Sequence, residues 1–235
     1  MKKPLIGIIG RSRLSDSGFN LIATPESERM AIIEHGGVPI LILPTQLVEY
    51  QKCMDHHPTP GELERLTEAE LNDLYQQLML CDGILLPGGD MMFEYDRKIC
   101  EYCINHDIPL LGICMGMQVM CTYNRGVCLK KINSSIQHKV LKEDYTHKVK
   151  LLPSRLKEIV KKDEIRVNSR HGYQVKNTGE CVVSAKAIDS VIEAVEIPDK
   201  KFCIGVQWHP ELDYHTNDSS KKLWQAFIES CKNSN

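Results

Sequence analysis

Short aliphatic runs alternate with segments of helical periodicity along the first half of the chain. The runs predict buried strands at residues 5–9, 38–43, 83–86 and 109–113. Between and after them, the spacing of apolar residues predicts helices over residues 24–35, 67–78, 97–106 and 115–123. Strands that alternate with helices are typical of βαβ units and a parallel sheet. The pattern therefore predicts an α/β fold.

Local signals mark where several of these elements begin and end. Thr24-Pro25 combines a capping residue with a proline at the first helical position, and Gly36-Gly37 ends that helix. Thr67 and Glu70 form a capping box for the next helix. Residues 38–43 are almost wholly aliphatic, so we expect this strand to be covered on both faces.

The second half of the chain is rich in β-structure. Strands are predicted over residues 148–152, 165–168, 181–187, 191–197 and 203–206. Hairpin-like turns are expected at 177–179 and 188–189, and a closing helix over 219–231. The chain contains no internal repeat, low-complexity segment or evident linker. We therefore expect residues 1–235 to form a single domain.

Composition and charge exclude several classes of protein. Of the 235 residues, 42% are hydrophobic and 26% are charged, as in ordinary globular proteins. The 29 basic and 31 acidic residues nearly cancel, so nucleic acid is not the expected partner. No apolar run reaches the length of a membrane span, and residues 4–10 are too short for a signal peptide. We expect a cytoplasmic protein that binds no membrane.

Ten cysteines form no regular disulfide framework. Cys100 and Cys103 lie one helical turn apart, and two thiols on one helix are expected rather than a redox or metal site. Cys53, His56 and His57 lie in a polar segment with two prolines, which is interpreted as a surface loop.

The most informative stretch is the G-x-C-x-G of residues 112–116, where a buried strand turns directly into a helix at Cys114. This is the thiol counterpart of the nucleophile elbow of serine hydrolases. Flanking glycines relieve crowding at the strained corner, and the helix N-terminus favours a thiolate. Taken alone, the motif is equally consistent with a buried structural cysteine.

A second stretch supplies the partners that a cysteine nucleophile needs. His209 follows the strand at 203–206, and Glu211 follows His209 across a proline. A thiol needs a base to accept its proton, and the base needs a group that orients its other nitrogen. Cys114, His209 and Glu211 are therefore the candidate catalytic triad, at the carboxyl edge of the sheet, where open α/β proteins place their sites.

Gly88-Gly89 follows another strand at the same edge. Without side chains, these residues let backbone N–H groups approach a ligand closely. The N–H groups of Gly89 and Met115 are the expected oxyanion hole. A simple type II turn is the alternative interpretation of the Gly-Gly pair.

Together these blocks resemble the class I glutamine amidotransferase superfamily, whose members carry a Cys-His-Glu triad. Finer features resemble its γ-glutamyl-γ-aminobutyrate hydrolase-like branch, which belongs to the peptidase C26 group. These features lie at residues 3–8, 36–39, 43–44, 147–149, 167–171 and 207–211. The resemblance covers residues 3 to 212. It implies a flavodoxin-like, three-layer fold with a mainly parallel central sheet and helices on both faces.

The resemblance also suggests substrate-binding residues. Gln118 is expected to hold the α-amino acid end of a glutamyl group, and His171 and Gly172 are expected to border the same pocket. For His171, a capped loop histidine is an equally good interpretation.

Two departures from the branch concern the pocket rather than the triad. Asp90 directly follows Gly89, where the branch has one intervening residue, and of the downstream Pro and Tyr only Tyr95 is retained. Lys130 and Lys131 replace the usual Gln-Asp. These lysines could favour a more acidic substrate, although a solvated surface change is the preferred interpretation.

The resemblance therefore implies a γ-glutamyl hydrolase acting on a small γ-glutamyl compound, without a metal or organic cofactor. One alternative is the ammonia-donating glutaminase subunit of an amidotransferase that works with a synthase. A second is a non-catalytic binding module on the same scaffold. The sequence does not define the oligomeric state, and a homodimer is one form it allows.

Overall fold

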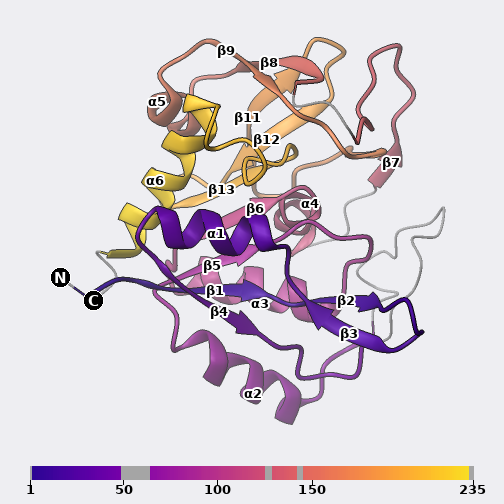
Figure 1. Ribbon diagram of the computed structural model, residues 1–235, viewed down its shortest axis with the longest axis vertical. Helices are drawn as coiled ribbons and strands as arrows, with labels where there is room; N and C mark the ends of the chain where they lie inside the picture. Colours follow the sequence, from indigo (N-terminus) through magenta and orange to yellow (C-terminus); the bar gives the residue numbers. More distant parts are fainter. Residues whose placement is uncertain (1, 49–63, 125–128, 142–144, 233–235) are drawn as a thin grey trace.

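A mixed sheet runs through the protein, whose computed structural model describes residues 2–48, 64–124, 129–141 and 145–232. In this part of the chain the sheet has nine strands in the order β4-β1-β5-β6-β13-β12-β11-β8-β9 (Figure 1). The strands are β1 (Leu5–Ile9), β4 (Val38–Ile42), β5 (Gly83–Leu86), β6 (Leu110–Ile113), β8 (His147–Leu151), β9 (Glu164–Val167), β11 (Val182–Ala187), β12 (Ile192–Glu196) and β13 (Cys203–Val206). Strands from both halves of the sequence therefore share one sheet.

The direction of pairing changes at β13. Strands β4, β1, β5, β6 and β13 pair in parallel, whereas β12, β11, β8 and β9 continue the sheet in antiparallel fashion. Parallel neighbours need a long crossover, which the helices of the first half supply. The turn at 188–189 joins β11 and β12 as a hairpin, as predicted.

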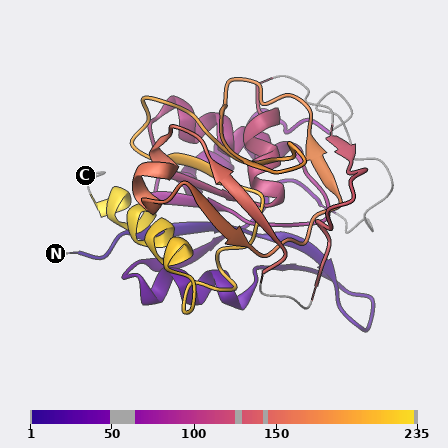
Figure 2. The same cartoon turned by 90° about the horizontal axis from the view of Figure 1, so that it is seen from above.

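Helices cover both faces of the sheet, which confirms the predicted three-layer fold. Figure 2 shows α1 and α6 on one side of the sheet and α4 on the other. The first face packs on α1 (Glu26–Glu34), α5 (Arg155–Val160) and α6 (Asp218–Lys232). The second face packs on α2 (Glu68–Leu78), α3 (Glu94–Asn105) and α4 (Met115–Thr122). Successive residues of β5 alternate between these cores, with Ile84 and Leu86 in one and Leu85 in the other.

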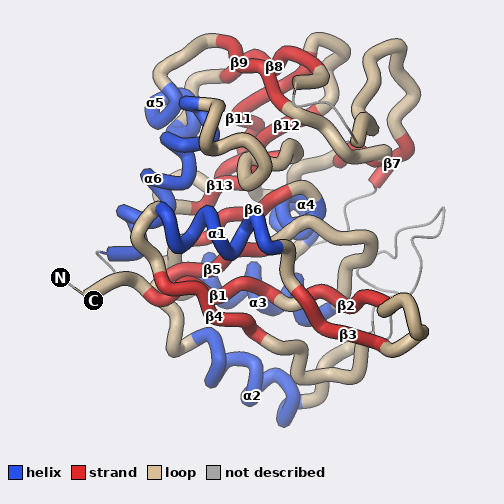
Figure 3. Tube along the Cα trace, viewed as in Figure 1, coloured by secondary structure: helices blue, strands red, loops and turns tan. Residues whose placement is uncertain are grey.

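Two small two-stranded sheets lie near the edge of the main sheet at which its parallel strands end (Figure 3). One is the hairpin of β2 (Arg11–Leu14) and β3 (Asn20–Ala23), and the other pairs β7 (Leu129–Lys131) with β10 (Tyr173–Val175). The sequence predicted neither, because these short segments are polar or mixed in pattern. The pairing of β10 with β7 also corrects the prediction at 177–179, where the turn joins two strands that do not pair with each other.

The expectation that residues 38–43 are covered on both faces was wrong. β4 is the edge strand, and Val38 and Leu41 are each 40% exposed. Pro39 suits such an edge, because proline has no N–H for a further neighbour.

Helix boundaries differ from the predictions in two places. Pro25 occupies the N-cap position of α1 without a side-chain cap, and the hydroxyl of Thr24 donates to Glu28 instead. Helix α3 begins at Glu94, three residues earlier than predicted, because the Asp96 carboxylate accepts the N–H of Phe93. The capping box of α2 and the closing helix α6 are confirmed.

Short helix α5 was not predicted, although Ser154 caps it by accepting the N–H of Lys157. Among the described residues, no helix combines the length and apolar character needed to cross a lipid bilayer.

Candidate active site

Cys114 lies at a strained corner between β6 and α4. Its backbone has φ +52° and ψ −105°, a conformation that non-glycine residues rarely adopt. A Cβ on Gly112 would lie 2.8 Å from the backbone of Gly116, and a Cβ on Gly116 would lie 2.0 Å from the Leu86 carbonyl oxygen. Both glycines of the motif are thus required for α4 to pack so closely on the sheet.

The Cys114 thiol differs from every other cysteine in the described part of the chain. It is partly exposed, whereas the others are buried: Cys81, Cys100, Cys103, Cys121, Cys181, Cys203 and Cys231. Burial raises the pKa of Cys81 to about 12, and it raises the pKa values of Cys100 and Cys103 well above the ordinary thiol value. Thiolate chemistry is therefore disfavoured at these three buried positions.

The C-x-x-C of α3 is accordingly a pair of core thiols, as interpreted from the sequence. The segment with Cys53, His56 and His57 lies outside the described residues.

His209 follows β13 and faces the nucleophile. Its Nδ1 lies 2.6 Å from Glu211 Oε1, and its ring interacts with the Cys114 side chain. Burial lowers the pKa of His209, but the carboxylate of Glu211 and the sulfur of Cys114 outweigh it and raise that pKa well above its ordinary value. The three predicted triad residues are therefore joined in one chain of contacts.

Asn168 clamps the backbone of the histidine. Its side-chain amide donates to the His209 carbonyl at 2.8 Å, while its Oδ1 accepts the His209 N–H at 2.9 Å. Both bonds join the residue after β9 to the segment after β13, and together they fix the segment that carries the ring. Asn168 lies within residues 167–171, one of the blocks that carry the resemblance, but no role was predicted for it.

Two amide side chains form a relay to the thiol. Gln118, one turn along α4, donates to Gln207 Oε1 at 3.2 Å, and Gln207 Nε2 lies 3.5 Å from Cys114 Sγ. Both glutamines are buried. Gln118 is thus held beside the nucleophile, and its predicted contact with the α-amino acid group of a substrate stays a prediction.

The Gly-Gly turn after β5 lies against both reactive side chains. A Cβ on Gly88 would lie 3.1 Å from His209 Cε1 and 3.5 Å from Cys114 Cβ, and a Cβ on Gly89 would lie 2.9 Å from Met115 Cε. Only residues without side chains leave this space for a substrate. The arrangement is compatible with the predicted oxyanion hole of Gly89 and Met115.

The buried ion pair of Arg11 and Asp96 packs against the Gly-Gly turn. Arg11 donates to the Pro87 carbonyl oxygen at 2.9 Å and pairs with Asp96, and both charged side chains are almost fully buried. The hydroxyl of Tyr95 donates to the Gly10 carbonyl oxygen at 2.9 Å. In the sequence, Arg11 was interpreted only as the end of an apolar run. Its role could not be predicted because its partners are 76 and 85 residues away.

A second carboxyl group, Glu28 of α1, lies near the triad. Burial and the negative charge of Glu211 raise the pKa of Glu28 to about 8, although Thr24, Arg11 and His209 act in the opposite direction. Glu28 is therefore mostly protonated at neutral pH, which limits repulsion of the Glu211 carboxylate.

The other predicted pocket residues lie close by but face elsewhere. His171 is buried, and its ring nitrogens face the Tyr173 carbonyl and Glu193 rather than Cys114. A Cβ on Gly172 would meet only the Lys139 side chain, in ordinary van der Waals contact at 4.0 Å. The structure leaves both roles as predictions.

The residues that depart from the pattern of the γ-glutamyl-γ-aminobutyrate hydrolase-like branch have solvent-exposed side chains. Lys130 and Lys131 are exposed on β7, and Asp90 is exposed after the Gly-Gly turn. Exposure of the lysines is what a solvated surface change would produce.

Several known proteins are similar to this chain in sequence or in fold. A glutamine amidotransferase-like protein of Rickettsia prowazekii is 27% identical, in an alignment covering 98% of this chain and 99% of that protein. A CTP synthase of Chlamydia trachomatis is 30% identical over 61% of this chain, but over only 32% of the synthase. The glutaminase domain of Trypanosoma brucei CTPS, solved with bound acivicin, has the same fold, with a TM-score of 0.64, 18% identity, and 99% of this chain and 95% of that one covered.

Fold and relatives together define a class I glutamine amidotransferase-like protein. The model of the peptidase C26 family matches residues 93–211, about half of the chain, and this range includes Cys114, His209 and Glu211. The chain belongs to the peptidase C26 family.

Proposed function

We propose that this protein hydrolyses the γ-glutamyl amide bond of a small γ-glutamyl compound through a thioester on Cys114. One observation carries the proposal. The partly exposed thiol at the strained corner contacts His209, which is itself oriented by Glu211 at 2.6 Å. This arrangement supplies a nucleophile, a proton carrier and an orienting carboxylate in line.

The reaction has two halves. The Cys114 thiolate attacks the γ-carbonyl carbon, and the resulting oxyanion is stabilised by the backbone N–H groups of Gly89 and Met115. The imidazolium of His209 protonates the leaving amine, so the C–N bond breaks and the thioester remains. His209 then takes a proton from water, the hydroxide displaces the thiolate, and glutamate leaves.

The glutaminase component of an amidotransferase is a second candidate. The names of the relatives favour it, since they include a glutamine amidotransferase-like protein and CTP synthase. Both candidates share the thioester. They differ in the preferred amide and in whether a synthase partner is needed for turnover.

The shared step is tested by trapping. Purified protein mixed briefly with a γ-glutamyl amide and quenched in acid is expected to carry a γ-glutamyl adduct on the peptide containing Cys114. Glutamate and free amine are expected in equal amounts. Cys121→Ala, a buried thiol on the same helix, serves as the control and is expected to keep the adduct. No turnover and no adduct with any amide tested, glutamine included, would refute the proposal.

A further inference from the structure

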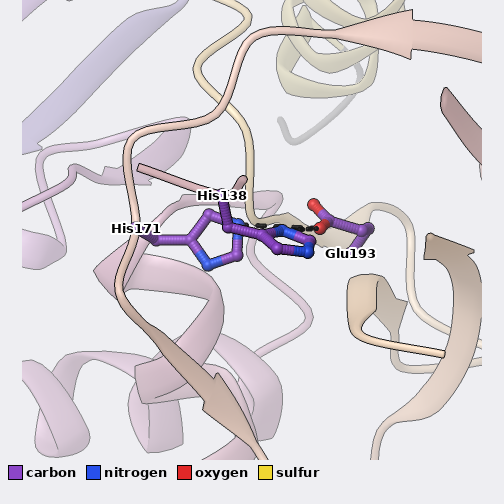
Figure 4. Close-up of side chains that lie close together, drawn as sticks. All are labelled: His138, His171 and Glu193. Carbon is purple, nitrogen blue, oxygen red and sulfur yellow. Dashed lines mark ion pairs between the residues drawn. The ribbon is translucent and has the colours of Figure 1, made fainter. Parts of the chain in front are cut away.

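A second cluster of histidines and a carboxylate lies next to the candidate active site. His138, His171 and Glu193 come from three separate segments of the chain and converge in the interior (Figure 4). They are 3%, 4% and 0% exposed, respectively. Glu193 lies on β12, and its backbone carbonyl accepts the N–H of Gln207. The cluster is therefore hydrogen-bonded to the residue whose side chain lies beside Cys114.

Two ring nitrogens face the Glu193 carboxylate. His138 Nδ1, His171 Nε2 and Glu193 Oε2 are buried and make no well-aligned hydrogen bond, although both nitrogens lie at ion-pair distance from Glu193 Oε1. His138 Nδ1 lies 3.1 Å and His171 Nε2 3.6 Å from Glu193 Oε1, and one ligand atom of each residue lies within 4.8 Å of the others. Bonds of about 2.0–2.2 Å to a tetrahedral Zn²⁺ place neighbouring ligands about 3.3–3.6 Å apart. The two nitrogen-to-oxygen distances are therefore close to those between neighbouring ligands of a bound metal ion.

The opposite nitrogen of each ring is already held by an acceptor. His138 Nε2 lies 2.9 Å from Asp189 Oδ2, and His171 Nδ1 lies 3.0 Å from the Tyr173 carbonyl oxygen. Because a carbonyl only accepts, His171 Nδ1 carries a hydrogen, which leaves Nε2 as the ring atom available to a ligand. The Asp189 carboxylate accepts from His138 Nε2 in the same way, which leaves Nδ1 of that ring. Metal-binding histidines are oriented by such outer partners.

A proton alone does not satisfy this arrangement. Glu193 Oε1 already has a donor, because His147 Nε2 lies 3.1 Å from it. His138 Nδ1 and His171 Nε2 both face this carboxylate, and one added proton can satisfy only one of these nitrogens at a time. A divalent cation would bind both nitrogens and the carboxylate together and offset the charge of the buried carboxylate.

We propose that His138, His171 and Glu193 bind a divalent transition-metal ion of the Zn²⁺ type. Two imidazole nitrogens with one carboxylate oxygen suit Zn²⁺ or Co²⁺ better than Mg²⁺ or Ca²⁺. The ion is structural and takes no part in amide hydrolysis. It joins the loop with His138 to the segment 168–173, which carries Asn168 and thereby supports His209.

The test is a Co²⁺ titration of chelator-treated Cys114→Ala protein, a background that removes the thiol as a competing ligand. One equivalent of Co²⁺ is expected to saturate a visible ligand-field band. Zn²⁺ at a thousand-fold excess over its Kd is expected to raise Tm by about 8–16 °C. His138→Gln and Glu193→Gln in this background are expected to lose both effects. His215→Gln, whose side chain is 64% exposed, is the matched control and is expected to keep both.

The proposal would be overturned if His138→Gln kept a saturable Co²⁺ band of unchanged strength, or if the Cys114→Ala protein bound no stoichiometric Co²⁺. The cluster would then be an ion pair between protonated histidine and Glu193. Should neither ligand variant fold, anomalous scattering from crystals of the Zn²⁺-loaded Cys114→Ala protein decides the question. A peak between His138, His171 and Glu193 supports the site, and a peak elsewhere or none refutes it.

Discussion

Two groups of histidine and carboxylate side chains lie near the neighbouring strands β12 and β13, and they differ in what the histidine faces. In the candidate active site, His209 pairs with Glu211 through one nitrogen and contacts a partly exposed thiol. In the interior, His138, His147 and His171 surround the fully buried Glu193, and one nitrogen of each ring faces its carboxylate. The same residue types thus form a reactive chain in one place and a cation-binding arrangement in the other.

The difference shows that solvent exposure decides which chemistry each group can perform. His209 can transfer protons to a substrate because Cys114, the side chain beside it, is partly exposed. A buried set of ligands can instead hold a charge permanently. The predictions below test this contrast, beginning with the largest expected effect.

Cys114→Ala is expected to lower kcat/KM for any γ-glutamyl amide by at least about 10⁴-fold, because no neighbouring group can form the thioester. Steady-state kinetics measure this loss, and circular dichroism checks that the fold is kept. The matched control, Cys121→Ala, removes a buried thiol from the same helix and is expected to retain activity within several-fold. Equal losses in the two variants would contradict the assignment.

Glu211→Gln is expected to lower kcat by about 10²–10⁴-fold, since an amide can hold His209 in the wrong tautomer and does not stabilise the imidazolium. The pKa of His209 is expected to fall, because the Glu211 carboxylate is the main charge that raises it. NMR titration of the histidine ring measures that fall. An unchanged pKa would show that the 2.6 Å contact is not the source of the shift.

Asn168→Ala is expected to lower kcat about 10-fold with little change in KM, because it removes both hydrogen bonds that fix the His209 backbone. Asn105→Ala, at the exposed end of α3, is the control. A loss confined to KM would instead indicate that Asn168 contacts the substrate.

Glu28→Gln is expected to flatten the pH dependence of stability. The pKa of Glu28 in the folded protein is raised from 4.5 to about 8, so the folded state holds this proton more tightly than the unfolded state. The stability it contributes is complete below pH 4.5 and is lost as pH rises through 8, by roughly 1 kcal/mol per pH unit.

Urea unfolding of the parent and Glu28→Gln proteins at pH 6 and pH 8.5 measures this effect. The parent is expected to lose more stability than the variant between these values. Glu26→Gln, an exposed change on the same helix, should behave like the parent. Parallel curves for all three proteins would contradict the burial argument.

The sequence predicted those parts of the site that are contiguous in the chain. Cys114 lies within one elbow motif, and His209 and Glu211 are two residues apart, so local patterns suffice to find them. Asn168, Gln207 and Arg11 were missed as site residues, because their roles depend on contacts with residues 41 to 93 positions away. No local periodicity records such contacts.

The same distinction explains the fold. Buried central strands such as β5 and β6 were predicted from their short aliphatic runs alone. The exposure of Val38 depends on β4 lying at the sheet edge, which only the strand order reveals. The interior cluster was likewise hidden, since His138, His171 and Glu193 are far apart in sequence.

The most direct test of the proposed function compares two substrates with the isolated protein. The account predicts that kcat/KM for a γ-glutamyl amide of a primary amine, such as γ-glutamyl-γ-aminobutyrate, exceeds that for glutamine when no other protein is present. Preference for glutamine, or activity that begins only when a partner from the same cell extract is added, would contradict the hydrolase and favour the glutaminase component.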